Sequence, residues 1–216
     1  MTTPVDLVAA VAPIRSVLES RHDAREIALS ASRDAIRSAA NAIRAVHRGE
    51  VERADALVVE ARAALRRAVA ATEGHPEVRH AGFVADAAKE VAEAELTRAA
   101  VAGDPLPEPD GVDVDEVAWL HGLAETVGEL RRATLDRVRG GDLDTAEGYL
   151  ELMQEILAAL VTIDVPDGLS RGLRRATDAA RAITERTRGD LTTAVGQREL
   201  RRALDAHRAA LEAAGS

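Results

Sequence analysis

The sequence predicts an all-α fold, and three observations carry that prediction. The 216-residue chain is 46% hydrophobic but only 1% aromatic, so Ala, Leu, Val and Ile must build its core. Strong helix formers recur throughout the chain, whereas runs of β-branched and aromatic residues, which favour strands, are missing. Apolar residues recur at helical spacing, as they do between Ile27 and Val46. We therefore expect a single helical domain over residues 1–216, with two small domains as the less common arrangement for this length.

Glycines, prolines and capping side chains divide the chain into about seven predicted helices. These cover, in order, residues 5–47 with an interruption near Pro13, 50–71, 77–100, 113 or 115 to 139, 142–163, 169–188 and 192–213. The first helix ends at Gly49, and a Gly-His-Pro break at residues 74–76 ends the second. Residues 103–111 form the one clear loop, because three prolines in five residues cannot continue a helix.

Capping signals define the second half of the chain. Asp113 or Asp115 is the expected N-cap of the helix that ends at residue 139, and Gly122 and Gly128 would let a neighbouring backbone approach that helix. Asp142 caps the next helix, which turns its larger apolar side chains inward. These are Leu150, Met153, Ile156, Leu157 and Leu160. The sequence Arg-Gly-Asp at residues 188–190 resembles the earlier helix ends, so it predicts a further stop.

Charge and composition exclude several classes of function. With 37 acidic and 28 basic residues the net charge is -9, which disfavours non-specific nucleic-acid binding but leaves a local basic patch open. Lys89 is the only lysine, and the arginines can engage phosphate bidentately. The absence of cysteine excludes disulfides and thiolate chemistry. No basic leader or apolar run of about 18 residues is present, so we expect a cytoplasmic protein without membrane contact.

Two acidic stripes are the candidate chemistry, because no phosphate-binding loop, His-Glu-x-x-His helix or nucleophile elbow occurs. At about 100° per residue, Asp86, Glu90 and Glu93 share one helical face, and Glu125 and Glu129 share another. Carboxylates from two helices would suit Mg²⁺ or Mn²⁺, which prefer hard oxygen ligands. By pattern alone, solvated acidic faces are the more common explanation of such stripes.

The charges around these stripes set further expectations. Carboxylates four residues apart cost a helix about 0.2–0.5 kcal/mol per pair. Lys89 and Arg132 are placed to compensate that cost, as a divalent cation would be. Glu95 points away from Glu90 on a helical wheel, and we expect it to be solvated.

Four segments together resemble the translin and translin-associated factor X family. Residues 22–34 with 45–49 are similar to the family's opening helix, and residues 119–130 (WLHGLAETVGEL) to its Tyr-Leu-x-Gly-Val-x-Asp-x-x-Gly-Glu-Leu segment. Residues 139–142 (RGGD) fall where the family has Gly-Asp, and residues 89–94 (KEVAEA) are similar to the Gln-Glu-Tyr-Val-Glu-Ala of the factor X branch. Order and spacing are kept from about residue 22 to residue 193.

This resemblance implies a translin-like bundle of about seven helices that assembles into a hollow barrel of about six to eight subunits. The factor X branch is a Mg²⁺-dependent endoribonuclease acting on single-stranded RNA, whereas the translin branch binds nucleic acid without cleaving it. The catalytic and metal-binding carboxylates carry over to Glu90, Glu93, Glu125 and Glu129, where the family has Asp at the Glu125 position. Val91 replaces a family Tyr, so base stacking on aromatic side chains can contribute little.

The same resemblance nominates residues for nucleic-acid contact. His75, Arg79 and His80 lie near the position of translin's contacts, although a simple helix-start turn explains them equally well. His121 and Arg132 share the stripe of Glu125, where a plain salt bridge is the alternative. The leading hypothesis is a Mg²⁺- or Mn²⁺-dependent endoribonuclease. The alternatives are a non-catalytic oligomer that binds single-stranded RNA or DNA, and a purely structural helical oligomer.

Overall fold

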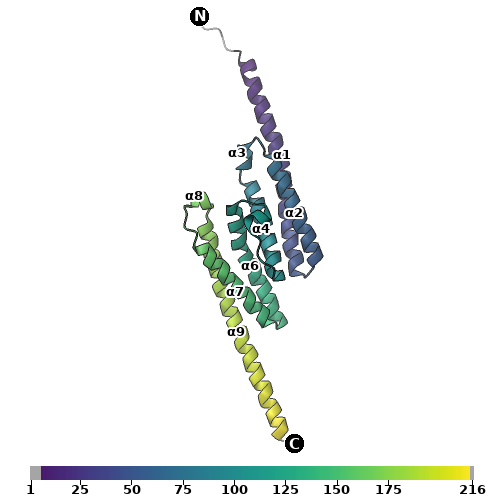
Figure 1. The fold of residues 1–216 in the computed structure, drawn as a ribbon, viewed down its shortest axis with the longest axis vertical. Helices are drawn as coiled ribbons and strands as arrows, with labels where there is room; N and C mark the ends of the chain where they lie inside the picture. Colours follow the sequence, from purple (N-terminus) through teal and green to yellow (C-terminus); the bar gives the residue numbers. More distant parts are fainter. Residues whose placement is uncertain (1–5, 215–216) are drawn as a thin grey trace. The chain divides into compact units, whose positions relative to one another are not determined.

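The computed structural model describes residues 6–214, and these are almost entirely helical (Figure 1). No strand occurs within them, so the all-α prediction is confirmed. The helices of this range are α1 (Leu7–His47), α2 (Val51–Ala71), α3 (Pro76–Arg79), α4 (Phe83–Ala102), α5 (Pro109–Val112), α6 (Glu116–Gly140), α7 (Leu143–Val161), α8 (Asp167–Ser170) and α9 (Leu173–Ala214). Val5, the expected start of the first helix, lies outside the described residues. Over residues 6–214, none of these helices combines the length and apolarity that crossing a bilayer requires.

The described residues cluster into two compact units. The first unit comprises the chain up to Arg98 together with Pro107–Gly122, and the second comprises Ala99–Leu106 with the chain from Leu123 onward. Helices α4 and α6 each continue without a break from one unit into the other. The single domain over residues 1–216 stays a prediction.

In the first unit, α1 and α2 form a hairpin (Figure 1), and most of the buried residues of the two helices are alanines. Gly49 turns the chain between them with a φ of 72°, a conformation that glycine adopts without strain. Alanines spaced three and four residues apart allow the two helices to approach closely. The buried alanines of the two helices include Ala24, Ala28, Ala31, Ala35, Ala39, Ala42, Ala54, Ala61, Ala64 and Ala68.

In the first half of the chain, two predicted helices differ from the observed ones. Pro13 lies inside α1 without ending it, so the expected interruption is absent. The helix predicted from residue 77 is two helices, α3 and α4, because the chain turns at Gly82 with a φ of 97°. The N-cap predictions are confirmed at Asp115, whose Oδ1 accepts the Ala118 N–H at 2.9 Å, and at Asp142, whose Oδ1 accepts the Thr145 N–H at 3.2 Å. Hydrogen bonds from Thr145 lower the pKa of the Asp142 carboxyl.

The loop between α4 and α6 is held in place by polar contacts. The indole N–H of Trp119 donates to the Pro107 carbonyl at 2.9 Å. The Arg62 guanidinium, on α2, donates to the carbonyl of Gly111 in α5. A proline-rich segment that cannot form a long helix is therefore fixed against the first unit by two side chains.

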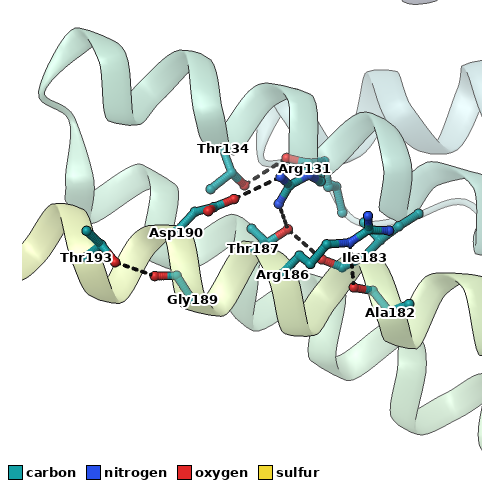
Figure 2. Close-up of polar contacts among 10 residues, drawn as sticks. Arg131, Thr134, Ala182, Ile183, Arg186, Thr187, Gly189, Asp190 and Thr193 are labelled. Carbon is teal, nitrogen blue, oxygen red and sulfur yellow. Dashed lines mark hydrogen bonds and ion pairs between the residues drawn. The ribbon is translucent and has the colours of Figure 1, made fainter.

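In the second unit, α7 packs on α9, and α9 runs through the predicted stop at residues 188–190. Figure 2 shows the reason: Arg131 of α6 donates to Thr187 Oγ1 at 3.0 Å and to Asp190 Oδ2 at 2.8 Å. Asp190 therefore pairs with a neighbouring helix and does not cap a new one. Gly189 sits within the helix, and Thr193 bonds back to its carbonyl at 3.0 Å. The two predicted C-terminal helices are thus one helix. It begins at Leu173 and not at residue 169, because the chain turns at Arg171 and Gly172 after α8.

Candidate metal centre

Helix α4 carries the first acidic stripe, and the structure buries its members to different degrees. Glu93 is 8% exposed, Glu90 is half-buried and Asp86 is exposed. The predicted compensation by Lys89 is confirmed, since its Nζ lies 3.1 Å from Glu90 Oε1. Glu90 and Glu93, one helical turn apart, are therefore the enclosed members of the stripe, whereas Asp86 faces solvent.

Gly122, near the start of α6, contacts the backbone of α4 beside these glutamates. A Cβ placed on Gly122 would lie 2.7 Å from Ala92 Cβ, 2.8 Å from the Glu93 amide nitrogen and 3.0 Å from the Lys89 carbonyl oxygen. Real Cβ atoms essentially never approach other heavy atoms below 3.0 Å. The predicted close approach of a backbone is therefore confirmed at Gly122. It is wrong at Gly128, where an added Cβ would meet nothing within 4 Å.

Glu125 follows Gly122 by one helical turn on α6 and is half-buried. Glu90, Glu93 and Glu125 each offer one carboxylate oxygen, and these oxygens lie within 4.8 Å of one another. We call these three residues the acidic cluster. Glu129, one further turn along α6, is half-buried but is not a member of this group, and its assignment as a fourth ligand stays a prediction.

The chemistry of the acidic cluster suits a hard divalent cation. All three donors are carboxylate oxygens, the ligand type that Mg²⁺ and Mn²⁺ accept. Two negative charges within 4.8 Å of each other repel by about 3 kcal/mol or more at an effective dielectric constant of about 20. A cation among them would relieve that repulsion, so the residues present fit a metal ion.

Glu95 does not face solvent, and this expectation was wrong. Its side chain is 10% exposed, and its Oε1 lies 3.2 Å from Arg62 Nη1. Burial raises the pKa of the Glu95 carboxyl, and the charges of Arg62 and Arg98 oppose that rise. Glu95 follows Val91 by four residues, so helical spacing already placed it near the apolar face of α4. The role of Arg62, which pairs with it, had no signal in the sequence.

The residues nominated for nucleic-acid contact before α4 lie around α3. His75 Nε2 is 3.3 Å from the Ser20 hydroxyl, and His75 Nδ1 is 3.9 Å from Glu77 Oε1. Arg79 is half-buried and lines a pocket of about 510 Å³, whereas His80 is exposed. His75 therefore ties α3 to α1, as a structural residue would, and RNA contact by these three residues stays a prediction.

The two nominated residues on α6 differ in exposure. His121 is half-buried and directly precedes Gly122, while Arg132 is exposed. Both stay predictions as phosphate contacts.

Solved structures similar to this chain show which family it belongs to, although no family model matches it. The structure of AfC3PO in complex with duplex RNA is 31% identical and superposes with a TM-score of 0.77 over 88% of this chain and 98% of that one. A second AfC3PO structure is 32% identical with a TM-score of 0.78 and the same coverage. Apo-NeC3PO shares the fold at 14% identity, with a TM-score of 0.78 over 90% of this chain and all of that one.

A stretch of 88 residues is also 33% identical to an uncharacterized protein of Methanocaldococcus jannaschii, of which it covers 39%. The fold is therefore that of the solved C3PO proteins, an all-α architecture. The chain belongs to the translin family. Its placement in the factor X branch stays a prediction.

Proposed function

We propose that this chain is an RNA-binding protein of the translin family and that its acidic cluster makes it a metal-dependent endoribonuclease. The observation that carries the proposal is the grouping of carboxylate oxygens from Glu90, Glu93 and Glu125 within 4.8 Å. RNA as the ligand is supported by the similarity to AfC3PO, a protein solved in complex with duplex RNA. Mg²⁺ or Mn²⁺ is the proposed cation, with Glu129 as a further ligand.

The protein's own residues hold and orient the reacting groups. Glu90 and Glu93 come from one turn of α4, so their spacing is fixed by a rigid element. When bound, the cation supplies Lewis-acid chemistry that polarises a phosphodiester and lowers the pKa of water. Glu93 is buried, and Lys89 beside Glu90 offers a positive charge to a phosphate. Contacts from His75, Arg79, His80, His121 and Arg132 to RNA belong to this proposal.

Single-stranded RNA is the proposed substrate, although the RNA bound to AfC3PO is a duplex. Both forms therefore belong in the assay. We also propose a hollow homo-oligomer of about six to eight subunits, because an enclosed chamber would limit which RNAs reach the acidic cluster. The proposed location is the cytoplasm.

The proposed site is tested by comparing the RNA cleavage rates of two variants, Glu93→Gln and Asp86→Asn. Both variants neutralise one carboxylate of α4, but only Glu93 belongs to the acidic cluster, while Asp86 is exposed seven residues earlier. We expect Glu93→Gln to lower the rate of Mn²⁺-dependent cleavage of labelled RNA by at least 100-fold and Asp86→Asn to change it less than threefold. Equal rates for both variants would show that the acidic cluster takes no part in RNA cleavage.

A non-catalytic RNA-binding protein is the second candidate, and the AfC3PO complex with RNA favours it directly. Such a protein would retain RNA on a gel in the presence of a chelator and would leave it intact when Mn²⁺ is added. Retention should weaken steeply with salt in either case, because phosphate contacts release counterions.

A further inference from the structure

We propose that Gly122 is a positioning residue for the acidic cluster, and that its missing side chain sets how closely Glu125 approaches Glu90 and Glu93. This inference rests on the proposed metal-binding function. It concerns a residue that offers no ligand atom itself. Gly122 would act only through the separation of two helices.

The contact at Gly122 is made against backbone, and backbone cannot yield easily. Two of the three atoms nearest to an added Cβ belong to the main chain of α4, the Glu93 amide nitrogen at 2.8 Å and the Lys89 carbonyl oxygen at 3.0 Å. The third is the Cβ of Ala92 at 2.7 Å, which is itself fixed to the helix. A methyl group on Gly122 therefore requires α6 to move away from α4 near Glu93.

The same contact lies at the acidic cluster. The Glu93 amide lies against Gly122, and the Glu93 carboxylate belongs to the acidic cluster. Lys89, whose carbonyl also lies against Gly122, forms an ion pair with Glu90 through its side chain. Glu125 follows Gly122 by three residues, so it shares the same side of α6 one turn later. A shift of α6 at Gly122 would carry Glu125 with it, and the three carboxylate oxygens would separate.

The relative affinities of the acidic cluster for small and large cations distinguish a change in its geometry from a general loss of protein stability. Mg²⁺ demands ligands at about 2.0–2.1 Å, whereas Ca²⁺ accepts about 2.3–2.6 Å in more flexible geometry. A cluster that is widened by a bulkier residue at 122 should therefore lose affinity for the smaller ions more than for Ca²⁺.

Gly122→Ala is tested beside Gly128→Ala, a change in the same helix where an added Cβ meets nothing within 4 Å. The dissociation constants of Mn²⁺ and Ca²⁺ are measured by titration of the purified full chain, with thermal melting as the control for folding. We expect Gly122→Ala to bind Mn²⁺ at least tenfold more weakly, about 1.4 kcal/mol, and to lose less affinity for Ca²⁺. Gly128→Ala should stay within twofold of wild type for both ions.

Wild-type Mn²⁺ affinity in a folded Gly122→Ala variant would overturn the inference and leave the proposed metal site intact. Absence of Mn²⁺ binding by wild-type protein would instead overturn the proposed site, and the inference with it. Should Gly122→Ala fail to melt cooperatively, it is combined with Ala92→Gly, which removes the nearest contact at 2.7 Å and leaves the two main-chain contacts at 2.8 Å and 3.0 Å, and the double variant is measured in its place. If the double variant also fails to fold, Gly122 is a requirement of the fold alone and the inference is wrong.

Discussion

Replacement of Arg62 by methionine tests the buried ion pair that holds α4 against α2. Arg62 Nη1 lies 3.2 Å from Glu95 Oε1, and the side chains of Glu95 and Arg62 are 10% and 30% exposed. Methionine keeps the length of the side chain and removes its charge, so a carboxylate is left buried without this partner. Loss of one partner from a buried pair costs about 3–5 kcal/mol. For a chain of this size, 1 kcal/mol shifts the melting temperature by about 2–4 °C, so we expect a fall of roughly 6–20 °C at pH 8.

The pH dependence of that loss identifies Glu95 as its source. Burial raises the pKa of this carboxyl above its ordinary value of 4.5, and removal of Arg62 should raise it further. A carboxyl with a raised pKa binds its proton more tightly in the folded state, so stability falls as pH rises through the window above 4.5 and returns as pH falls. The Arg62→Met variant should therefore recover part of its melting temperature between pH 8 and pH 5.

Two controls accompany this measurement. Arg37→Met breaks a 2.6 Å pair with Asp34 in which Arg37 is 66% exposed, and it should shift the melting temperature little. Glu95→Gln in the Arg62→Met background removes the buried charge and should restore most of the loss. A wild-type melting temperature for Arg62→Met at pH 8, or a loss that is equal at pH 8 and pH 5, would refute the reasoning.

Three further predictions concern metal, helix and RNA. Lys89→Met should tighten Mn²⁺ binding by roughly 3- to 10-fold. The Lys89 ammonium lies 3.1 Å from Glu90 and would repel a cation bound there by about 1 kcal/mol at a partly exposed site. Weaker Mn²⁺ binding by the variant would show that Lys89 supports the acidic cluster. Gly189→Ala should raise stability by about 0.5–1 kcal/mol since this residue lies inside α9, whereas Gly141→Ala, at a φ of 82°, should lower it by about 1 kcal/mol. Thermal melting compares the two. RNA retention should fall linearly in a plot of log affinity against log salt, and a flat line would contradict binding through phosphates.

Local signals in the sequence predicted most helix boundaries correctly. Asp115 and Asp142 cap the helices they were expected to cap, and α1 ends at His47 as predicted. The errors came from tertiary contacts, which a local signal cannot report. The Arg-Gly-Asp at residues 188–190 resembles a helix stop, yet Arg131 engages Asp190 and the helix continues (Figure 2).

The candidate site shows the same division between local and tertiary information. The helical period placed Glu90 and Glu93 on one face of α4 and singled out Glu125 and Glu129 on α6. The family resemblance then joined the four residues in one predicted site. The period could not show which acidic residues are enclosed, because burial depends on the neighbouring helices. Glu95 was therefore expected in solvent although it is paired with Arg62 inside the first unit. The sequence predicts a close approach at Gly122, but only the structure shows that α4 is the helix it approaches.

Incubation of the purified wild-type chain with labelled single-stranded and duplex RNA, with and without Mn²⁺, tests the central claim most directly. The proposed function predicts that single-stranded RNA is cleaved when Mn²⁺ is present and is bound but left whole in a chelator. RNA that stays intact at saturating Mn²⁺, or RNA that is cut equally well in the chelator, would contradict a metal-dependent endoribonuclease centred on Glu90, Glu93 and Glu125.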